Sequence, residues 1–193
     1  CLSEPHAGSN PAEMSTTAAY DPAADEYVLN GEKQWITNGE RGGVAIVFAK
    51  VPDGSDSSSG DADDAVDAED ADAADAITQF LVPADAVGFE VGKREDKLGL
   101  RASDTTGIRF DGCRIPAENR LTEVGEGLSS AFRTLTGGRI GIAAQAVGVA
   151  QAALDASTAY AGEREQAGRP IADTQTMRHT LAEMATDVSA ARL

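Results

Sequence analysis

The sequence contains few cysteine and histidine residues, and their scarcity excludes two kinds of site. Two cysteines in 193 residues are too few for the dense disulfide framework of a small secreted domain. We therefore expect Cys113 to pack as a small apolar residue. The cysteines and the two histidines, at positions 1, 113, 6 and 179, form no closely spaced ligand pairs of the kind that zinc sites use. No metal is predicted.

Long uninterrupted apolar runs are also missing. No run approaches the roughly 18 apolar residues needed to cross a bilayer, and no basic start followed by an apolar stretch indicates a secretory signal. We therefore expect a globular protein of the cytoplasm that does not associate with membranes. The chain opens on Cys1 instead of methionine and stops at Leu193 inside a helical pattern, so we interpret it as a piece of a longer protein.

Basic residues are scarce as well. The chain has 16 Lys and Arg against 32 Asp and Glu, a net charge of −16. Binding to nucleic acid requires a basic footprint that neutralises phosphates, so this partner is excluded. The excess of acidic charge favours a salt-adapted, halophilic source, in which salt screens the self-repulsion. An ordinary acidic protein of a mesophile is the alternative.

The first part of the chain shows the alternation of apolar and polar residues that is typical of strands. The expected strands cover residues 16–18, 26–29, 34–37, 44–49, 79–82, 89–91, 106–110 and 114–116. Asn30 and Gly31 stand between the second and the third, and predict a hairpin because both central turn residues need positive φ. Many short strands with turn signals predict an antiparallel barrel or sandwich.

Residues 52–76 consist almost entirely of Asp, Ala, Ser and Gly. They offer little to bury, so ordering them would cost more entropy than their contacts return. Because strands are expected on both sides, we interpret this acidic stretch as a solvated, enlarged hairpin connection. A functional acidic segment is the alternative.

The character of the chain changes near residue 122. Apolar residues recur at positions 128, 132, 135, 142 and 149, as a helix buried along one stripe requires. The segment 168–170 should end this helix, and a second helix is expected to begin near Asp173. The prediction is an α+β protein: an antiparallel β-domain over residues 1–122, then helices of an incomplete bundle over residues 123–193.

Four motifs follow one another along the chain: CLSEPHAGSN (1–10), WITNG (35–39), KLGLRASDT (97–105) and RIGIA (139–143). Together they resemble the signatures of acyl-CoA dehydrogenases, in order and over nearly the whole chain, with the acidic stretch as an extra. The resemblance implies the middle β-domain of that family and the start of its C-terminal helical domain.

The resemblance also implies an FAD site. Trp35 and Thr37 should share one face of a strand, with Trp35 packing on the isoalloxazine ring, Thr37 near flavin N5 and Ser3 near the pyrimidine edge; a core Trp with a satisfied Thr is the alternative. The implied cofactor-binding residues are Leu2, Ser3, Ser9, Trp35, Ile36, Thr37, Arg164 and Gln175. Arg164 and Gln175 would reach the FAD of a neighbouring subunit, and Ala167 replaces an aromatic residue usual in the family.

A second set of residues is implied to contact the CoA part of a substrate. Gly137 and Gly138 occupy a helix, where each glycine costs about 1 kcal/mol relative to Ala, which indicates close approach to the backbone. With them the resemblance implies Ser9, Thr136 and Arg139, although the family often has Asp at the position of Thr136. Close packing between helices is the alternative.

The implied reaction is α,β-dehydrogenation of an acyl-CoA thioester, with hydride transfer to flavin N5. The resemblance implies a Glu base from a later part of the helical domain, so no catalytic residue is assigned here. Expected partners are the acyl-CoA substrate, an electron-transfer flavoprotein as electron acceptor, and identical subunits in a homodimer or homotetramer. The alternatives are an acyl-CoA oxidase, a flavin monooxygenase-like relative, or a non-catalytic homologue that binds flavin or CoA.

Overall fold

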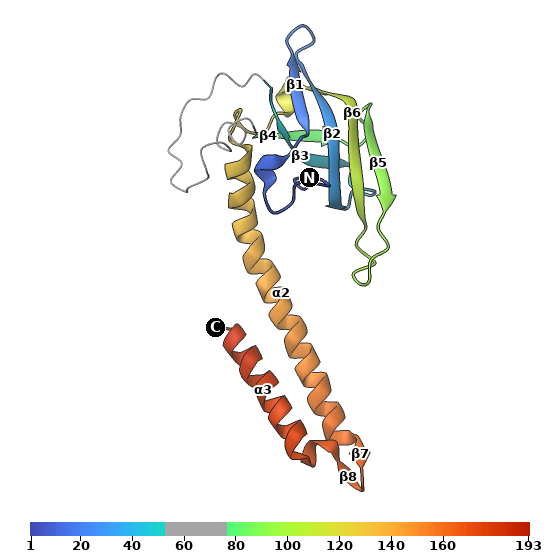
Figure 1. Cartoon of the computed structure of the whole chain (residues 1–193), viewed down its shortest axis with the longest axis vertical. Coiled ribbons are helices and arrows are strands. Elements are labelled where there is room, and N and C mark those ends of the chain that lie inside the picture. The colour runs from blue at the N-terminus through green and yellow to red at the C-terminus, as the bar shows by residue number, and fades with distance from the viewer. Residues whose placement is uncertain (53–76) are drawn as a thin grey trace. The chain divides into compact units, whose positions relative to one another are not determined.

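The computed structural model describes residues 1–52 and 77–193 (Figure 1). The chain divides into two compact units, Cys1–Phe132 and Arg133–Leu193. The first unit contains all the strands of the larger sheet, and the second contains most of one long helix and all of another. Each unit is described in turn.

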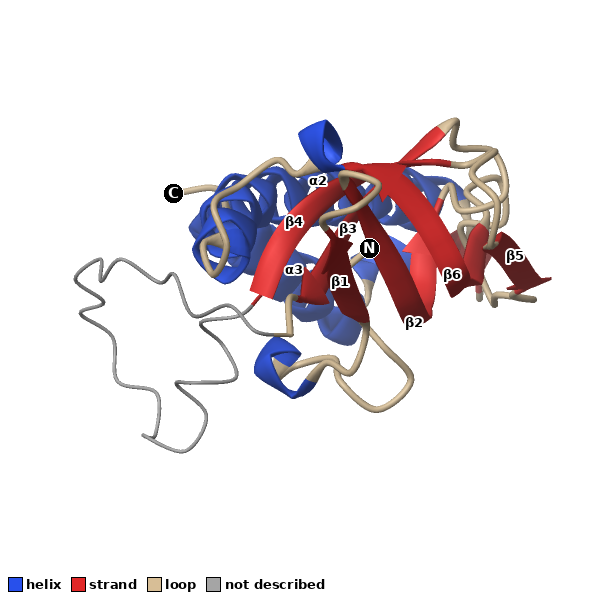
Figure 2. Ribbon diagram, turned by 90° about the horizontal axis from the view of Figure 1, so that it is seen from above, coloured by secondary structure: helices blue, strands red, loops and turns tan. Residues whose placement is uncertain are grey.

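The first unit is built on a six-stranded sheet (Figure 2). Its strands are β1 (Thr17–Asp21), β2 (Glu26–Thr37), β3 (Val44–Lys50), β4 (Ile77–Pro83), β5 (Phe89–Arg94) and β6 (Thr105–Pro116). They lie in the order β4-β3-β1-β2-β6-β5. All neighbours are antiparallel except β1 and β3, which meet in parallel at Thr17 and Lys50. The sheet is therefore mixed and does not close into a barrel, whereas the expected α+β class is confirmed.

The hairpin predicted at Asn30 and Gly31 is wrong. Strand β2 continues through both residues, and its register against β6 shifts between Leu29 and Gly31 as in a β-bulge. Gly31 has a φ of 146°, and a Cβ there would lie 2.7 Å from the Cα of Thr16. A bulge and a hairpin turn both use a glycine with positive φ, so the dipeptide did not distinguish them. The hairpin instead joins β1 to β2 at residues 22–25.

The sheet encloses the main apolar core of the first unit. Cys113 is buried within it, as predicted. The other buried members are Ala18, Tyr27, Leu29, Ala45, Val47, Ala49, Val51, Phe80, Val82, Ile108, Phe110 and Ile115. A smaller cluster joins the sheet to the first turns of helix α2 (Gly127–Glu163) through Met14, Phe48, Ile77 and Ala131. Short 3-10 helices, η1 (Pro11–Glu13) and η2 (Ala117–Asn119), complete the unit.

The acidic stretch connects two neighbouring strands, as expected. Strands β3 and β4 pair antiparallel, with Lys50 opposite Ile77. Residues 53–76 themselves lie outside the described residues, so the solvated loop stays a prediction.

The second unit contains the rest of α2, a small hairpin and helix α3 (Gln175–Ala191). The hairpin pairs β7 (Glu165–Gln166) with β8 (Arg169–Pro170), and its two turn residues, Ala167 and Gly168, have φ of 51° and 76°. Such a two-residue turn with both φ positive suits a tight hairpin. A 3-10 helix, η3 (Ile171–Asp173), leads into α3. The predicted helix break and the second helix are thereby confirmed.

The apolar stripe of α2 is not buried against the described residues, contrary to the prediction. Phe132, Leu135, Ile142 and Val149 are each between 43% and 67% exposed. By length and composition alone α2 is apolar enough to cross a membrane, with a mean hydropathy of 1.2 over its best window. A helix that packs on all sides inside a helical domain has the same composition. The helix is thus correct in place, but only its first turns, with Leu128 and Ala131, are seen to pack against the smaller cluster.

Candidate functional site

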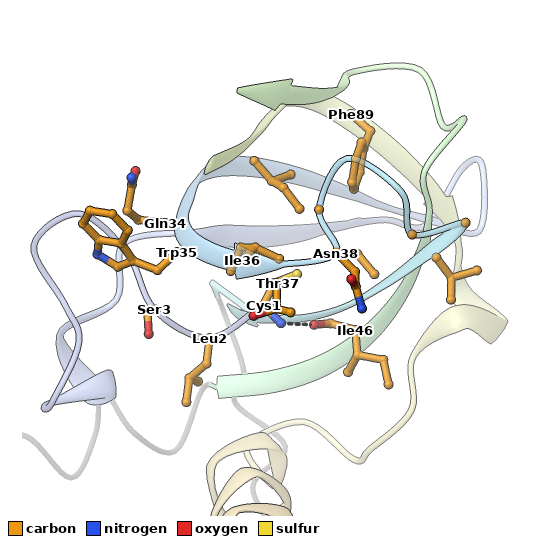
Figure 3. Close-up of a pocket in the computed structure, with 16 residues that line it drawn as sticks. Cys1, Leu2, Ser3, Gln34, Trp35, Ile36, Thr37, Asn38, Ile46 and Phe89 are labelled. Carbon is orange, nitrogen blue, oxygen red and sulfur yellow. Dashed lines mark hydrogen bonds between the residues drawn. The ribbon is translucent and has the colours of Figure 1, made fainter. Parts of the chain in front are cut away.

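A pocket of about 620 Å³ opens in the first unit (Figure 3). Three parts of the chain form most of its wall: residues 1–3, the end of β2 with the following turn at residues 34–39, and residues 42–46 at the start of β3. Phe89 from β5 and Ile108 from β6 add an apolar side. Five residues predicted to bind the cofactor line this one pocket: Leu2, Ser3, Trp35, Ile36 and Thr37.

Backbone hydrogen bonds hold residues 1–3 in the wall. The N–H of Gln34 donates to the carbonyl of Ser3 at 2.9 Å, and the N–H of Phe48 donates to the carbonyl of Cys1 at 3.2 Å. The segment is therefore bonded to β2 on one side and to β3 on the other. In this way the first motif and the WITNG motif, far apart in the sequence, come together.

Trp35 stands at an irregularity of β2. The register against β6 shifts between Lys33 and Ile36, and Trp35 has a φ of 62°. A bulky residue with positive φ is strained. The regular alternation from which a shared face was inferred is therefore absent at this point. Nevertheless Trp35 and Thr37 are both exposed, Ile36 between them packs against the core, and all three line the pocket.

A fully buried ion pair lies behind residues 1–3. The Nζ of Lys33 contacts the carboxylate of Glu4 at 2.8 Å, and neither side chain is exposed to solvent. The same carboxylate accepts hydrogen bonds from the backbone N–H groups of Ser15 and Thr16 and from both of their hydroxyls. Lys33 also donates to the carbonyl of Leu2 at 3.3 Å. A buried charge is tolerated when it is paired and hydrogen-bonded in this way.

The environment of this pair shifts both pKa values. Burial alone would raise the pKa of Glu4, but the hydrogen bonds from Lys33, Ser15 and Thr16 outweigh it and lower the pKa to about 2. Burial lowers the pKa of Lys33, and the contact with Glu4 opposes that shift only in part. Charge-assisted hydrogen bonds favour the ionised carboxylate, so Glu4 carries a negative charge at neutral pH.

The turn after β2 is held by a buried aspartate. The carboxylate of Asp104 accepts from the N–H of Glu40 at 3.0 Å, and its backbone carbonyl accepts from the N–H of Asn38 at 3.2 Å. Asn38 and Gly39 line the pocket, and a Cβ at Gly39 would lie 2.2 Å from the hydroxyl of Thr106. Asp104, in the KLGLRASDT motif, therefore orders one rim of the pocket.

The other predicted site residues do not line this pocket. Ser9 is exposed at a bend inside the first motif. Thr136, Gly137, Gly138 and Arg139 are exposed on α2, and Arg164 and Gln175 are exposed next to the β7–β8 hairpin and at the start of α3. These six residues belong to the second unit. Their roles stay predictions.

The residues of the pocket suit one side of a flat, partly polar heterocycle. The indole of Trp35 is 61% exposed and lies beside Gln34 in Figure 3. The hydroxyls of Ser3 and Thr37 have no hydrogen-bond partner among the described residues, and Leu2 and Phe89 supply apolar surface. An aromatic face with free hydroxyls at its edge fits the ring system of a flavin. In the described part of the chain, no group of three or more His, Cys, Asp or Glu could hold a metal ion.

Sequence reasoning overlooked the pair behind the pocket. Tyr27, Leu29 and Lys33 are the second, fourth and eighth residues of β2 and are all buried, so Lys33 occupies an inward position that an apolar residue would normally fill. An inward lysine predicts a buried acid nearby, and Glu4 in the first motif was available. Phe89 and Ile108 carried no comparable signal, because only the long-range pairing of β5 with β6 brings them to the pocket.

Both parts of the chain are similar to known proteins. The family model for the acyl-CoA dehydrogenase middle domain matches residues 1–113, and the model for the C-terminal domain of the same family matches residues 125–193. The chain is 44% identical over 192 residues to the mitochondrial short-chain specific acyl-CoA dehydrogenase of Rattus norvegicus, covering 100% of this chain and 42% of that protein.

Solved structures agree with this match. Butyryl-CoA dehydrogenase from Megasphaera elsdenii has a TM-score of 0.85 and 38% identity, covering 99% of this chain and 45% of that one. An acyl-CoA dehydrogenase complexed with FAD from Bacillus anthracis has a TM-score of 0.83 and 34% identity, covering 98% of this chain and 29% of that one. The chain spans less than half the length of these relatives, and it belongs to the acyl-CoA dehydrogenase family.

Proposed function

We propose that this chain supplies one wall of an FAD site in an enzyme that dehydrogenates an acyl-CoA thioester between its α and β carbons. The observation that carries the proposal is the pocket where Ser3, Trp35 and Thr37 come together. Family membership supports it, as does the FAD bound to the relative from Bacillus anthracis. The similarity to short-chain and butyryl-CoA dehydrogenases favours a short acyl chain.

Each pocket residue has a distinct task in this proposal. FAD, when bound, supplies the acceptor for the hydride that leaves the β carbon. The indole of Trp35 would pack against the flavin ring, the hydroxyl of Thr37 would donate a hydrogen bond to N5, and Ser3 would contact the pyrimidine edge. The apolar side chains of Leu2 and Ile36 exclude water from the ring.

Removal of the α proton requires a carboxylate on the opposite side of the substrate. We assign this base to a part of the helical domain outside this chain. Glu4 is unsuited to the role because it is buried and its carboxylate accepts five hydrogen bonds. On α2, Thr136, Gly137, Gly138 and Arg139 would contact the CoA part of the substrate, and Arg164 and Gln175 would reach the FAD of a neighbouring subunit.

Further properties of the full-length enzyme belong to the same proposal. They are a homodimeric or homotetrameric assembly, an electron-transfer flavoprotein as electron acceptor, and a location in the cytoplasm without membrane association. The net charge of −16 supports a salt-adapted protein, because salt screens self-repulsion between like charges. A melting temperature that does not rise between dilute buffer and molar KCl would rule out salt adaptation.

The test of the proposed function replaces Thr37 by Val in the full-length protein. Valine keeps the shape and removes the donor, so the variant should fold and hold FAD. A hydrogen bond that strengthens toward the transition state raises turnover more than substrate affinity. We expect flavin reduction by a short acyl-CoA to slow by roughly tenfold to a hundredfold, a loss of about 1.4 to 2.8 kcal/mol at the barrier.

Stopped-flow bleaching of the oxidised flavin band under single turnover measures this rate. Thr17→Val on β1, which does not line the pocket, is the matched control and should reduce at the wild-type rate. If Thr37→Val also reduces at the wild-type rate, the placement of the flavin beside Thr37 is wrong. A full-length protein that holds FAD but is not reduced by any acyl-CoA would favour a non-catalytic homologue.

A further inference from the structure

We propose that Lys33 and Glu4 are positioning residues of the flavin pocket, which fix the segment bearing Leu2 and Ser3 against the part of β2 that bears Trp35 and Thr37. The expected effects on FAD rest on the proposed function, whereas the contacts of Lys33 and Glu4 are observed without the cofactor. Neither residue lines the pocket, so both would act through the residues that do.

The pair connects three parts of the chain. The carboxylate of Glu4 holds residues 15 and 16 through four hydrogen bonds. The Nζ of Lys33 contacts this carboxylate at 2.8 Å and the carbonyl of Leu2 at 3.3 Å. Lys33 therefore bonds to the backbone of Leu2, which lines the pocket, and to the side chain of Glu4, which follows the pocket residues 1–3.

The bonds fall next to the pocket residues themselves. Leu2 is bonded to Lys33 and Ser3 is bonded to Gln34, so two successive residues of the segment face two successive residues of β2. The next residue of β2 is Trp35, whose φ is 62°. A strained backbone persists only when its surroundings hold it, and these two bonds lie immediately before it. Figure 3 shows Ser3, Gln34 and Trp35 grouped at the same side of the pocket.

An ion pair suits positioning better than stability. A buried pair contributes little net stability compared with apolar residues of similar volume, because desolvation offsets the attraction. However, it tolerates few alternative arrangements, since any displacement leaves a charge without its partners. The close packing of Gly31 on Thr16, which donates to Glu4, restricts the pair further. The pair thus defines where residues 2 and 3 lie.

The experiment uses the full-length protein with Lys33→Met or Glu4→Gln, and Lys93→Met on the exposed face of β5 as the control. Apoprotein is titrated with FAD well below the melting temperature, and the visible spectrum and reduction potential of the flavin are recorded. Hydrogen exchange is compared between peptides covering residues 1–9 and peptides covering residues 77–83 of β4.

We expect FAD to bind at least about tenfold more weakly in both pair variants, with a shifted flavin spectrum. Exchange should accelerate in residues 1–9 but not in 77–83.

Other results would distinguish a positioning role from a purely structural one. A lower melting temperature with unchanged FAD affinity, spectrum and potential would show a purely structural role and overturn the proposal. So would the failure of both pair variants to fold while Lys93→Met folds, because the pair would then be needed by the whole unit. If the wild-type protein holds no FAD, the proposed function fails, yet selective exchange in residues 1–9 of the variants would still support the positioning role.

Discussion

The two units of the chain differ in how much of their apolar surface is buried. The first unit buries a continuous apolar core and pairs its buried charges, Glu4 and Lys33, within its own residues. The second unit exposes much of its apolar surface, including Leu135, Ile142 and Val149. The apolar residues that form the core of the first unit are therefore already packed, whereas much of the apolar stripe of α2 is exposed and can pack against further surfaces, as apolar stripes of helices usually do.

Particular glycines show the same contrast. A Cβ at Gly31 or Gly39 would meet atoms of the first unit closer than 3 Å, whereas a Cβ at Gly137, Gly138 or Gly148 would meet nothing within 4 Å. Gly31 and Gly39 therefore serve close contacts that are already made. Gly137 and Gly138 leave room that a substrate or another helix would fill, which accords with the proposed CoA contacts.

The largest effect expected from this comparison concerns apolar truncation. Phe80 is fully buried and packs against Tyr27 in a tilted arrangement, with the ring centroids 4.9 Å apart, so Phe80→Ala should cost about 3 to 5 kcal/mol of unfolding free energy in the 193-residue chain. Ile142 is 67% exposed, and Ile142→Ala should change it by less than about 0.5 kcal/mol. In the full-length protein we expect Ile142→Ala to cost about 2 kcal/mol or more.

Denaturant unfolding of both variants in both proteins measures these differences. The comparison between the units fails if Ile142→Ala is as harmless in the full-length protein as in the chain alone. In that case the exposed stripe of α2 has no partner in either protein.

The second effect is the dependence of the unfolding free energy on pH, which tests the Glu4–Lys33 pair of the first unit. The pKa of Glu4 in the folded protein is about 2, below its ordinary value of 4.5. A depressed pKa gives stability that is fully present above about pH 4.5 and is lost as the pH falls toward 2. The contribution is about 3 kcal/mol. Unfolding free energies measured between pH 5 and 2 should fall less steeply in Glu4→Gln.

His6 lies 3.6 Å from the same carboxylate, so His6→Asn is the matched control. This variant should keep the acid-dependent loss, because Lys33, Ser15 and Thr16 remain bonded to Glu4. An equal acid response in Glu4→Gln and wild type would mean that other carboxylates govern this window.

Local patterns explain how much of the fold could be predicted. Alternation located parts of all six strands of the larger sheet, although β2 and β6 were each predicted as two strands and β7 and β8 were not predicted. The 3.6-residue period located both helices, because these signals depend on neighbours in sequence. At Asn30 and Gly31 the same local signal failed, since only the partner strand β6 decides between a turn and a bulge. Similarly, the periodicity of α2 predicted a buried stripe, but most of that stripe is exposed in the described part of the chain, because burial depends on what packs against a helix and not on its own sequence.

The candidate site was predictable to the extent that motifs carry it. Ser3, Trp35 and Thr37 were inferred from the family resemblance and do line one pocket. The support of that pocket was not inferred, because Lys33 fell between two expected strands without a role and Asp104 was noted only as part of a motif. Both are buried polar residues, and burial arises from the tertiary structure. An inward position occupied by a charge was the signal available in the sequence.

The smallest expected effect compares one glycine in each setting. In the 193-residue chain, Gly137→Ala should raise the unfolding free energy by up to about 1 kcal/mol, because alanine favours the helix and its Cβ meets nothing within 4 Å. Gly148→Ala, also in open space on α2, should do the same. In the full-length protein only Gly137→Ala should weaken acyl-CoA binding, by roughly tenfold, if the CoA chain approaches the backbone there. Isothermal titration with a short acyl-CoA product analogue measures this affinity, and equal affinities for both variants and wild type would remove residue 137 from the substrate site.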